Sequence, residues 1–139
     1  RVGYDNTLGY LAGSMQSWID AGFETAAIGR ITATELETLM NNGEESVIDV
    51  RKPGEYNSAH IANVPNLPLD FINEHVADFP SKKTTYLHCA GGYRSMIAAS
   101  ILKARGFHNM IDVIGGFGQI KNTKLPMVTQ ECTSTCSTK

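Results

Sequence analysis

The feature that most constrains this chain is the alternation of short β-branched runs with helical stretches from Thr32 onward. Residues 47–51, 84–88 and 110–114 have the composition of strands, and glycine or proline follows soon after each run. Strands that alternate with helices are typical of a parallel sheet, because parallel strands need long crossover connections. We therefore predict an α/β fold with a central, mostly parallel sheet flanked by helices.

Local signals place the ends of the helices. Thr32 and Glu35 have the spacing of a capping box, and the run Asn41-Asn42-Gly43 is expected to end the helix that follows them. Gly106 similarly closes an apolar helix that should begin near Tyr93 or Arg94. Further helices are predicted at residues 70–77 and 117–122, and at most a short, irregular edge segment at residues 63–69, which contain Pro65 and Pro68.

Length and charge limit the domain organisation and the partners. A chain of 139 residues, 42% of them hydrophobic, can bury one core but leaves little room for a second. We expect a leading segment at residues 1–29, a domain at residues 30–128 and a mobile tail at residues 129–139. The formal net charge of −2 gives no electrostatic reason to expect a nucleic acid partner. No apolar run approaches the roughly 18 to 20 residues that span a bilayer, so we expect a soluble domain without a membrane partner.

The cysteines favour a reducing setting. Their number is odd, and Cys89 lies far in sequence from Cys132 and Cys136, so a disulfide framework is a poor explanation. We therefore expect a cytoplasmic location. Cys132 and Cys136 could form a local disulfide or bind a stray metal ion, but a tail without a role is the favoured interpretation. The scattered histidines have no metal-ligand spacing, so we predict neither a bound metal nor a cofactor.

Cys89 is the candidate nucleophile. It stands at the predicted carboxyl end of a parallel strand, where open α/β sheets bind their ligands. Glycines in the loop that follows allow backbone N–H groups to turn toward the sulfur, and the next helix adds the positive end of its dipole. Arg94 is expected to help these groups lower the pKa of the thiol. The loop comprises Cys89-Ala90-Gly91-Gly92-Tyr93-Arg94-Ser95.

Two plainer interpretations compete with this one. A free cysteine at a strand end is commonly a small buried hydrophobic residue, although such a residue does not require a Gly-Gly loop and an arginine. His88 precedes the nucleophile, but alternation along a strand should direct its side chain to the opposite face. We therefore predict that His88 is a packed histidine and not the general base.

The loop resembles the active-site signature of the rhodanese family, in which glycine, arginine and serine or threonine follow the cysteine at this spacing. Asp49-Val50-Arg51 with Glu55, His60-Ile61 with Asn66, and Gly115-Gly116-Phe117 are similar to three further family segments in the same order. The resemblance covers about residues 30–128. It implies a rhodanese-like three-layer fold and a catalytic Cys89, with Asp49, Arg51 and His60 in supporting positions.

The chain also departs from the family pattern. The second segment normally reads Gly-His-Ile/Val-Pro-Gly-Ala, whereas this chain has alanine at positions 59 and 62, Asn63, Val64 and then Pro65, which puts the local backbone in doubt. The leading run around Gly13 and Trp18 looks like the closing helix of another rhodanese-like domain. This arrangement is similar to proteins that fuse a metallo-β-lactamase-like domain to rhodanese repeats, so residues 1–29 are expected to be a domain remnant or a linker.

The resemblance implies a sulfurtransferase. A donor such as thiosulfate or a persulfide would load sulfur on Cys89, and a thiol or cyanide would remove it. An alternative is a persulfide carrier or regulatory module for a fused persulfide dioxygenase domain. A third possibility, a phosphatase or arsenate reductase, is disfavoured because related enzymes place five residues between cysteine and arginine, whereas here there are four.

Overall fold

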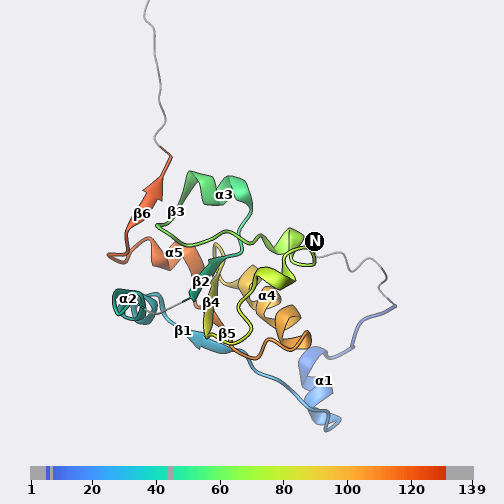
Figure 1. Ribbon diagram of the computed structural model, residues 1–139. Coiled ribbons are helices and arrows are strands. Elements are labelled where there is room, and N and C mark those ends of the chain that lie inside the picture. Colours follow the sequence, from blue (N-terminus) through green and yellow to red (C-terminus); the bar gives the residue numbers. More distant parts are fainter. Residues whose placement is uncertain (1–5, 7, 44–45, 131–139) are drawn as a thin grey trace, which may run out of the picture.

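A computed structural model describes residues 6, 8–43 and 46–130 (Figure 1). Its centre is a parallel sheet in the strand order β1-β5-β4-β2. This confirms the three strands predicted from the sequence and adds an edge strand, β1, that was not predicted. The strands are β1 (Gly29–Ile31), β2 (Ser46–Asp49), β4 (Thr85–His88) and β5 (Met110–Val113).

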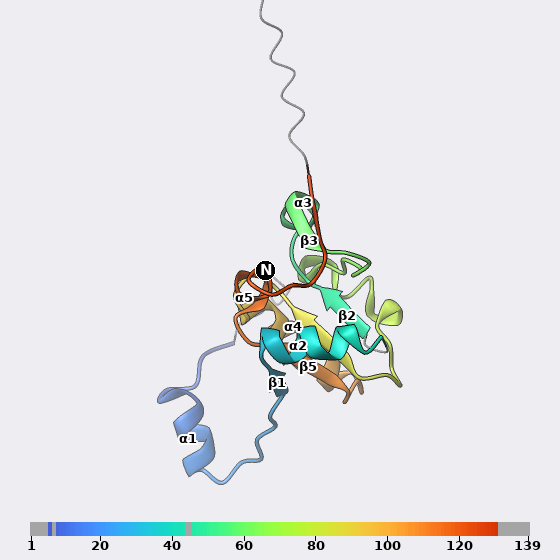
Figure 2. The same cartoon turned by 90° about the vertical axis from the view of Figure 1, so that its left-hand side faces the viewer.

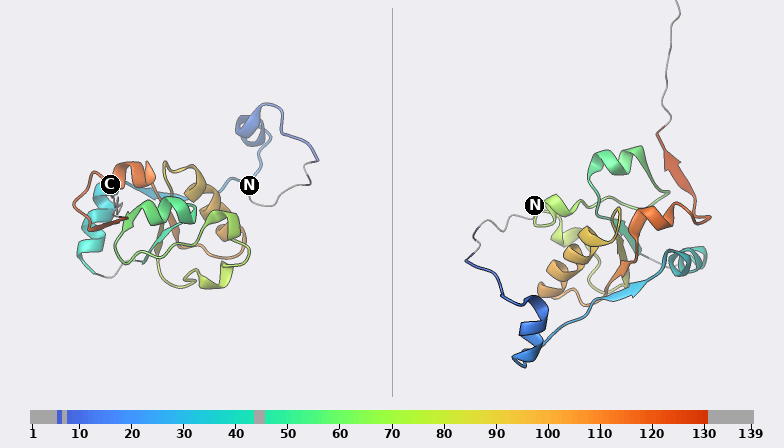
Figure 3. Two further views of the ribbon diagram at one scale, coloured as in Figure 1. Left: turned by 90° about the horizontal axis from the view of Figure 1, so that it is seen from above. Right: turned by 180° about the vertical axis from the view of Figure 1, so that it is seen from behind.

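Helices cover both faces of this sheet, which confirms the three-layer architecture (Figure 3). The helix α4 (Tyr93–Ala104) packs Ala98 and Leu102 into one core, to which the 3₁₀ turn η1 (Leu69–Phe71) contributes Leu69. A second 3₁₀ turn, η2 (Val76–Asp78), directly precedes the core residue Phe79. The opposite face is covered by α2 (Ala33–Asn41) and α5 (Gly116–Ile120), which contribute Leu36 and Ile120 to a second core. The predicted capping box of Thr32 and Glu35 is present at the start of α2.

One predicted helix is wrong. Residues 70–77 form the turns η1 and η2 and not a continuous α-helix. The interruption falls at His75, whose φ of −105° and ψ of 9° lie outside the helical region. The His75 ring contacts the Asp78 carboxylate at 2.9 Å within the second turn. Apolar periodicity alone did not reveal where the helical backbone is interrupted.

A small unit stands beyond the carboxyl ends of the parallel strands (Figure 1). It consists of α3 (Pro53–Ser58) and an antiparallel pair, β3 (Ala59–Ile61) and β6 (Met127–Thr129). β6 ends at Thr129, one residue after the predicted end of the domain at residue 128. Of the rest of the predicted tail, Gln130 is described, and residues 131–139, which include Cys132 and Cys136, lie outside the described residues.

The departure from the family pattern after β3 is accommodated locally. Asn63 stands where the family has glycine, and its φ of 63° lies in the left-handed region. Asparagine tolerates this conformation better than most residues, so the turn forms without glycine. The segment then forms a parallel bridge between Asn66 and Asp49, in agreement with the short edge segment predicted there.

The leading helix α1 (Ser14–Asp20) stands apart from the layered domain and buries no residue (Figure 2). The backbone φ angles at the start of α1 are similar to those at the start of α5. Gly13 and Ser14 have φ values of 79° and 59°, and Gly115 and Gly116 have 74° and 51°. Two consecutive positive φ angles are uncommon outside glycine pairs. The positive φ at Ser14, which corresponds to Gly116, is therefore a more specific similarity than the presence of a short helix in both places.

Candidate active site

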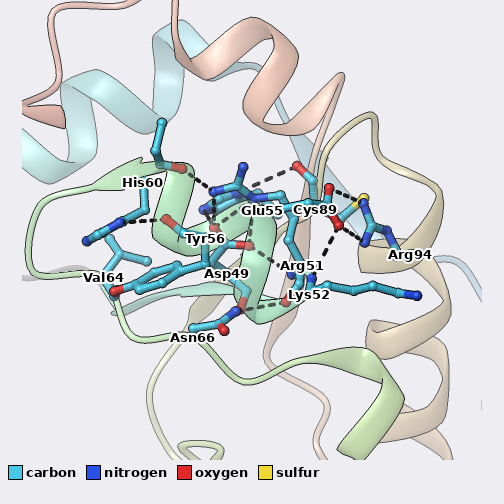
Figure 4. Close-up of polar contacts among 12 residues, drawn as sticks. Asp49, Arg51, Lys52, Glu55, Tyr56, His60, Val64, Asn66, Cys89 and Arg94 are labelled. Carbon is cyan, nitrogen blue, oxygen red and sulfur yellow. Dashed lines mark hydrogen bonds and ion pairs between the residues drawn. The ribbon is translucent and has the colours of Figure 1, made fainter. Parts of the chain in front are cut away.

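Cys89 lies directly after β4, at the carboxyl edge of the sheet (Figure 4). The loop turns at Gly92, which caps α4 with a φ of 99°, a conformation that glycine adopts at little cost. α4 then begins at Tyr93, one of the two residues at which its start was predicted. The structure therefore brings the cysteine, the glycine turn and the helix start together at one point.

Hydrogen-bond donors surround the sulfur. The Gly92 N–H donates to Sγ of Cys89 at 3.1 Å, and the Ser95 hydroxyl lies 3.5 Å from the same atom. Burial raises the pKa of the Cys89 thiol, but hydrogen bonds from the Ser95 hydroxyl and from the N–H groups of Ser95, Gly91 and Gly92 outweigh it. The net effect is a lowered pKa, as the sequence predicted. Ser95 belongs to the predicted loop, but the sequence analysis did not name it as a donor to the sulfur.

Arg94 is engaged by a partner that the sequence analysis did not assign to it. Its guanidinium donates to both carboxylate oxygens of Glu55, at 2.6 and 2.8 Å. This hydrogen bonding is the main cause that lowers the pKa of Glu55 and raises that of Arg94. The thiolate of Cys89 also raises the pKa of Arg94, so the cation acts on both groups. Glu55 belongs to a family segment, but no sequence signal named its partner.

The start of α5 holds the loop from behind. The N–H of Phe117 donates to the carbonyl of Cys89 at 2.7 Å, and the N–H of Gly118 donates to that of Ala90 at 2.9 Å. A Cβ atom on Gly116 would lie 2.3 Å from the Cys89 carbonyl oxygen. The loop and α5 can therefore approach this closely only if residue 116 has no side chain.

Asp49 and Arg51 connect β2 to α5. The two side chains form a buried ion pair, with Nη2 of Arg51 2.6 Å from Oδ2 of Asp49. The Arg51 guanidinium lies 3.9 Å from the centre of the Phe117 ring, and the Asn66 amide donates to the backbone carbonyls of both members of the pair. These contacts support the element that holds the loop and do not touch the sulfur.

The two histidines near the site differ in position. His60 stacks on Tyr56 with ring centres 3.8 Å apart and contacts the Tyr56 carbonyl through Nδ1 (Figure 4). The structure does not bring it to Cys89. His88 is fully buried, and its Nε2 lies 3.8 Å from Oδ2 of Asp49. Burial is the main cause that lowers the pKa of His88. The prediction that His88 is a packed residue is confirmed.

Asp112 is a site residue that the sequence analysis missed. It is fully buried in β5, accepts a hydrogen bond from the Ser95 hydroxyl at 2.6 Å and pairs with Nε of Arg30 at 3.0 Å. The signal was an acidic residue inside an otherwise apolar strand, because a buried carboxylate requires partners.

Comparisons with known proteins agree with this geometry. The profile of the rhodanese-like domain matches residues 32–123. The chain belongs to the rhodanese-like family. It is 33% identical over 97 residues to the uncharacterized protein YqhL of Bacillus subtilis, a match that covers 67% of this chain and 77% of that protein.

Another relative is the probable adenylyltransferase/sulfurtransferase MoeZ of Mycobacterium tuberculosis, 33% identical over 100 residues, or 70% of this chain and 26% of that one. Because the match spans only about a quarter of MoeZ, the activity of that whole protein does not transfer to this chain. A rhodanese-related protein from Thermoplasma volcanium superposes with a TM-score of 0.66 at 30% identity, covering 73% of this chain and 99% of that structure. The rhodanese-like domain is thus the shared unit, and it occurs in proteins that handle sulfur.

Within residues 6, 8–43 and 46–130, no group of three or more histidine, cysteine or acidic side chains is arranged to hold a metal ion. Over the same residues, none of the helices has both the length and the apolar character needed to cross a membrane.

Proposed function

We propose that this domain is a sulfurtransferase that carries sulfane sulfur as a persulfide on Cys89. The observation that carries the proposal is the placement of Sγ of Cys89 among N–H and O–H donors at the end of β4. Such donors stabilise a thiolate, which is the attacking form of cysteine. In this proposal the N–H groups of the same loop also stabilise the anionic outer sulfur of a persulfide on Cys89.

The reaction has two displacement steps. The Cys89 thiolate attacks the outer sulfur of thiosulfate or of a persulfide, an S–S bond to Cys89 forms, and the donor's S–S bond breaks. The leaving group, sulfite or a thiolate, departs with the electron pair. A thiolate or cyanide then attacks the outer sulfur of the Cys89 persulfide. The bond to Cys89 breaks and its electron pair returns to Sγ, which regenerates the thiolate.

A second candidate is a persulfide carrier with slow turnover. The observation that favours it is the Arg94–Glu55 pair, because Glu55 binds the guanidinium group that could otherwise orient an anionic donor such as thiosulfate. Cys89 is also only 1% exposed, so little of it faces a free acceptor. In this case a neighbouring domain, such as a fused metallo-β-lactamase-like persulfide dioxygenase, would receive the sulfur. Either role suits a reducing compartment such as the cytoplasm, where thiolates persist.

Intact-mass measurement tests the proposal. After incubation with thiosulfate, the wild-type protein should gain the mass of one sulfur atom, and cyanide should remove it. The Cys89→Ser variant should stay at its original mass, whereas the double variant Cys132→Ser/Cys136→Ser should load sulfur normally. Loading that survives in Cys89→Ser would refute the assignment. Full loading combined with slow cyanide turnover would favour the carrier.

A further inference from the structure

Three buried side chains, those of Cys89, Ser95 and Asp112, lie in contact in a row that leads from the sulfur into the domain. β5 lies between β1 and β4, with Asp112 in register with Arg30 on one side and Leu87 on the other. Cys89 follows Leu87 by two residues, so its side chain lies on the same face of the sheet as that of Asp112. α4 covers this face and supplies Ser95, whose hydroxyl contacts both Cys89 and Asp112.

The distances favour Asp112 over Cys89 as the acceptor for the hydroxyl hydrogen of Ser95. Ser95 is 2.6 Å from Oδ1 of Asp112 but 3.5 Å from Sγ of Cys89, and a serine hydroxyl has only one hydrogen to donate. While Cys89 is a thiol, this hydrogen goes to Asp112 and the hydroxyl oxygen faces the S–H group; Ser95 donates to the sulfur, the contact that lowers the pKa of Cys89, once the thiolate has formed. Ser95 and Asp112 are fully buried and Cys89 is 1% exposed, so little solvent can replace either contact.

We propose that Asp112 is a positioning residue that receives, through Ser95, the proton released by Cys89. The S–H bond of Cys89 breaks as its hydrogen passes to Oγ of Ser95, and the original hydroxyl hydrogen of Ser95 passes to Oδ1 of Asp112. Ser95 then donates to the thiolate and accepts from the neutral carboxyl group of Asp112. The inference rests on the proposed function, because it concerns how the same thiolate forms.

Charge balance inside the domain favours this path. If the Cys89 proton left for solvent, a thiolate would form beside a buried carboxylate, and two like charges in contact with one serine disfavour each other. With the transfer, one negative charge moves from Asp112 to the sulfur and the total is unchanged. Arg30 contacts Oδ2 of Asp112 and by its charge favours the ionised carboxyl group, which opposes the transfer, but it is 47% exposed and leaves Oδ1 free for Ser95.

Two other sets of charged or titratable groups lie near these residues. The ion pair of Arg94 with Glu55 lies beside the loop. The opposite face of the sheet holds Asp49, Arg51 and His88. The test variants therefore change Asp112 and Ser95, which leaves these neighbouring groups in place.

The pH dependence of Cys89 alkylation by iodoacetamide tests the proposal without any sulfur donor. Two groups that share a proton titrate together, so the wild-type rate should show a plateau at neutral pH and a second rise in alkali. In Asp112→Asn the carboxylate is gone, and the rate should follow a single titration that falls about tenfold for each pH unit below the pKa.

Two further variants serve as a second test of the proton path and as a control. Ser95→Ala keeps the Asp112–Arg30 pair but interrupts the path, so it should also give a single titration, displaced to higher pH because the thiolate loses a donor. Asp78→Asn removes an exposed carboxylate of η2 and should keep the wild-type profile. A single titration in the wild type, or a plateau that persists in Asp112→Asn or Ser95→Ala, would overturn the inference.

Failure of this inference is distinguishable from failure of the proposed function. If the wild type loads sulfur on Cys89 but alkylation shows no shared proton, only the role of Asp112 is wrong. If alkylation shows the plateau but no sulfur is loaded, the sulfurtransferase proposal fails and the proton path stands.

Discussion

At the scale of single residues, neutral donors surround the Cys89 sulfur while the nearby cation is shared. The Gly92 N–H donates to the sulfur, whereas Arg94 forms two short hydrogen bonds with Glu55. Paired, charge-assisted hydrogen bonds of this geometry are strong and directional. An anionic sulfur donor must therefore compete with Glu55 for Arg94.

The substitution Glu55→Gln should release this competition. Glutamine retains an oxygen that can accept from the Lys52 N–H at the start of α3, but it no longer neutralises Arg94. Because the pair is partly exposed, we expect the KM for thiosulfate to fall by about two- to fivefold. Steady-state kinetics with cyanide as acceptor measures it, with Glu74→Gln, an exposed site, as the matched control. An unchanged or increased KM would show that Arg94 does not contact the donor.

At the scale of elements, the loop takes its shape from α5 as well as from its own glycines. Phe117 and Gly118 donate to the carbonyls of Cys89 and Ala90, and this contact requires the absence of a side chain at Gly116. Gly91 differs, because a Cβ atom there would meet nothing within 4 Å. The two glycines of the site are therefore expected to respond differently to the same substitution.

The substitution Gly116→Ala should displace the loop from α5. Its methyl group would lie 2.3 Å from the Cys89 carbonyl oxygen at a φ of 51°, so both sterics and backbone conformation oppose it. Overpacking of this kind costs about 1–3 kcal/mol, and we expect sulfur loading to fall with it. Gly91→Ala, the matched control, should change the free energy of unfolding by less than about 0.5 kcal/mol. Urea unfolding and intact mass measure both effects, and equal behaviour of the two variants would contradict this account of the loop.

At the scale of the whole molecule, the features that were predicted correctly from the sequence are those that depend on residues close together in the chain. The capping box of α2, the strands β2, β4 and β5, and the start of α4 each depend on neighbouring residues, and each was predicted correctly. The Arg94–Glu55 and Ser95–Asp112 contacts join residues 39 and 17 positions apart, so only the assembled sheet defines them. β1 was missed because a strand of three residues is too short for a periodic pattern.

The leading segment was predicted to be a domain remnant or a linker, and we retain the remnant as a proposal. The matching φ angles at the first turns of α1 and α5 support it, because the turn of α5 has a specific task in holding the Cys89 loop. α1 has no such partner among the described residues, and apolar side chains such as Tyr10 and Ile19 remain exposed. The layered domain itself starts earlier than predicted, since β1 begins at Gly29 and Ile28 packs against the core.

Deletion of residues 1–24 tests whether this segment belongs to the catalytic unit. The deletion removes α1 together with the contact between Trp18 and Phe23, but it keeps Ile28, β1 and the Ala27 carbonyl to which Lys103 donates. Because α1 buries no residue, the free energy of unfolding should change by less than about 0.5 kcal/mol.

The rate of sulfur loading on Cys89, followed by intact mass, should stay the same in this truncated protein. A longer deletion, of residues 1–31, serves as the contrast because it also removes β1. That strand pairs with β5 and carries Arg30, the ion-pair partner of buried Asp112, so its loss should leave a buried carboxylate without its cation and destabilise the domain. If the shorter deletion abolishes loading in a protein that remains folded, α1 contributes to the active site and is not a remnant of another domain.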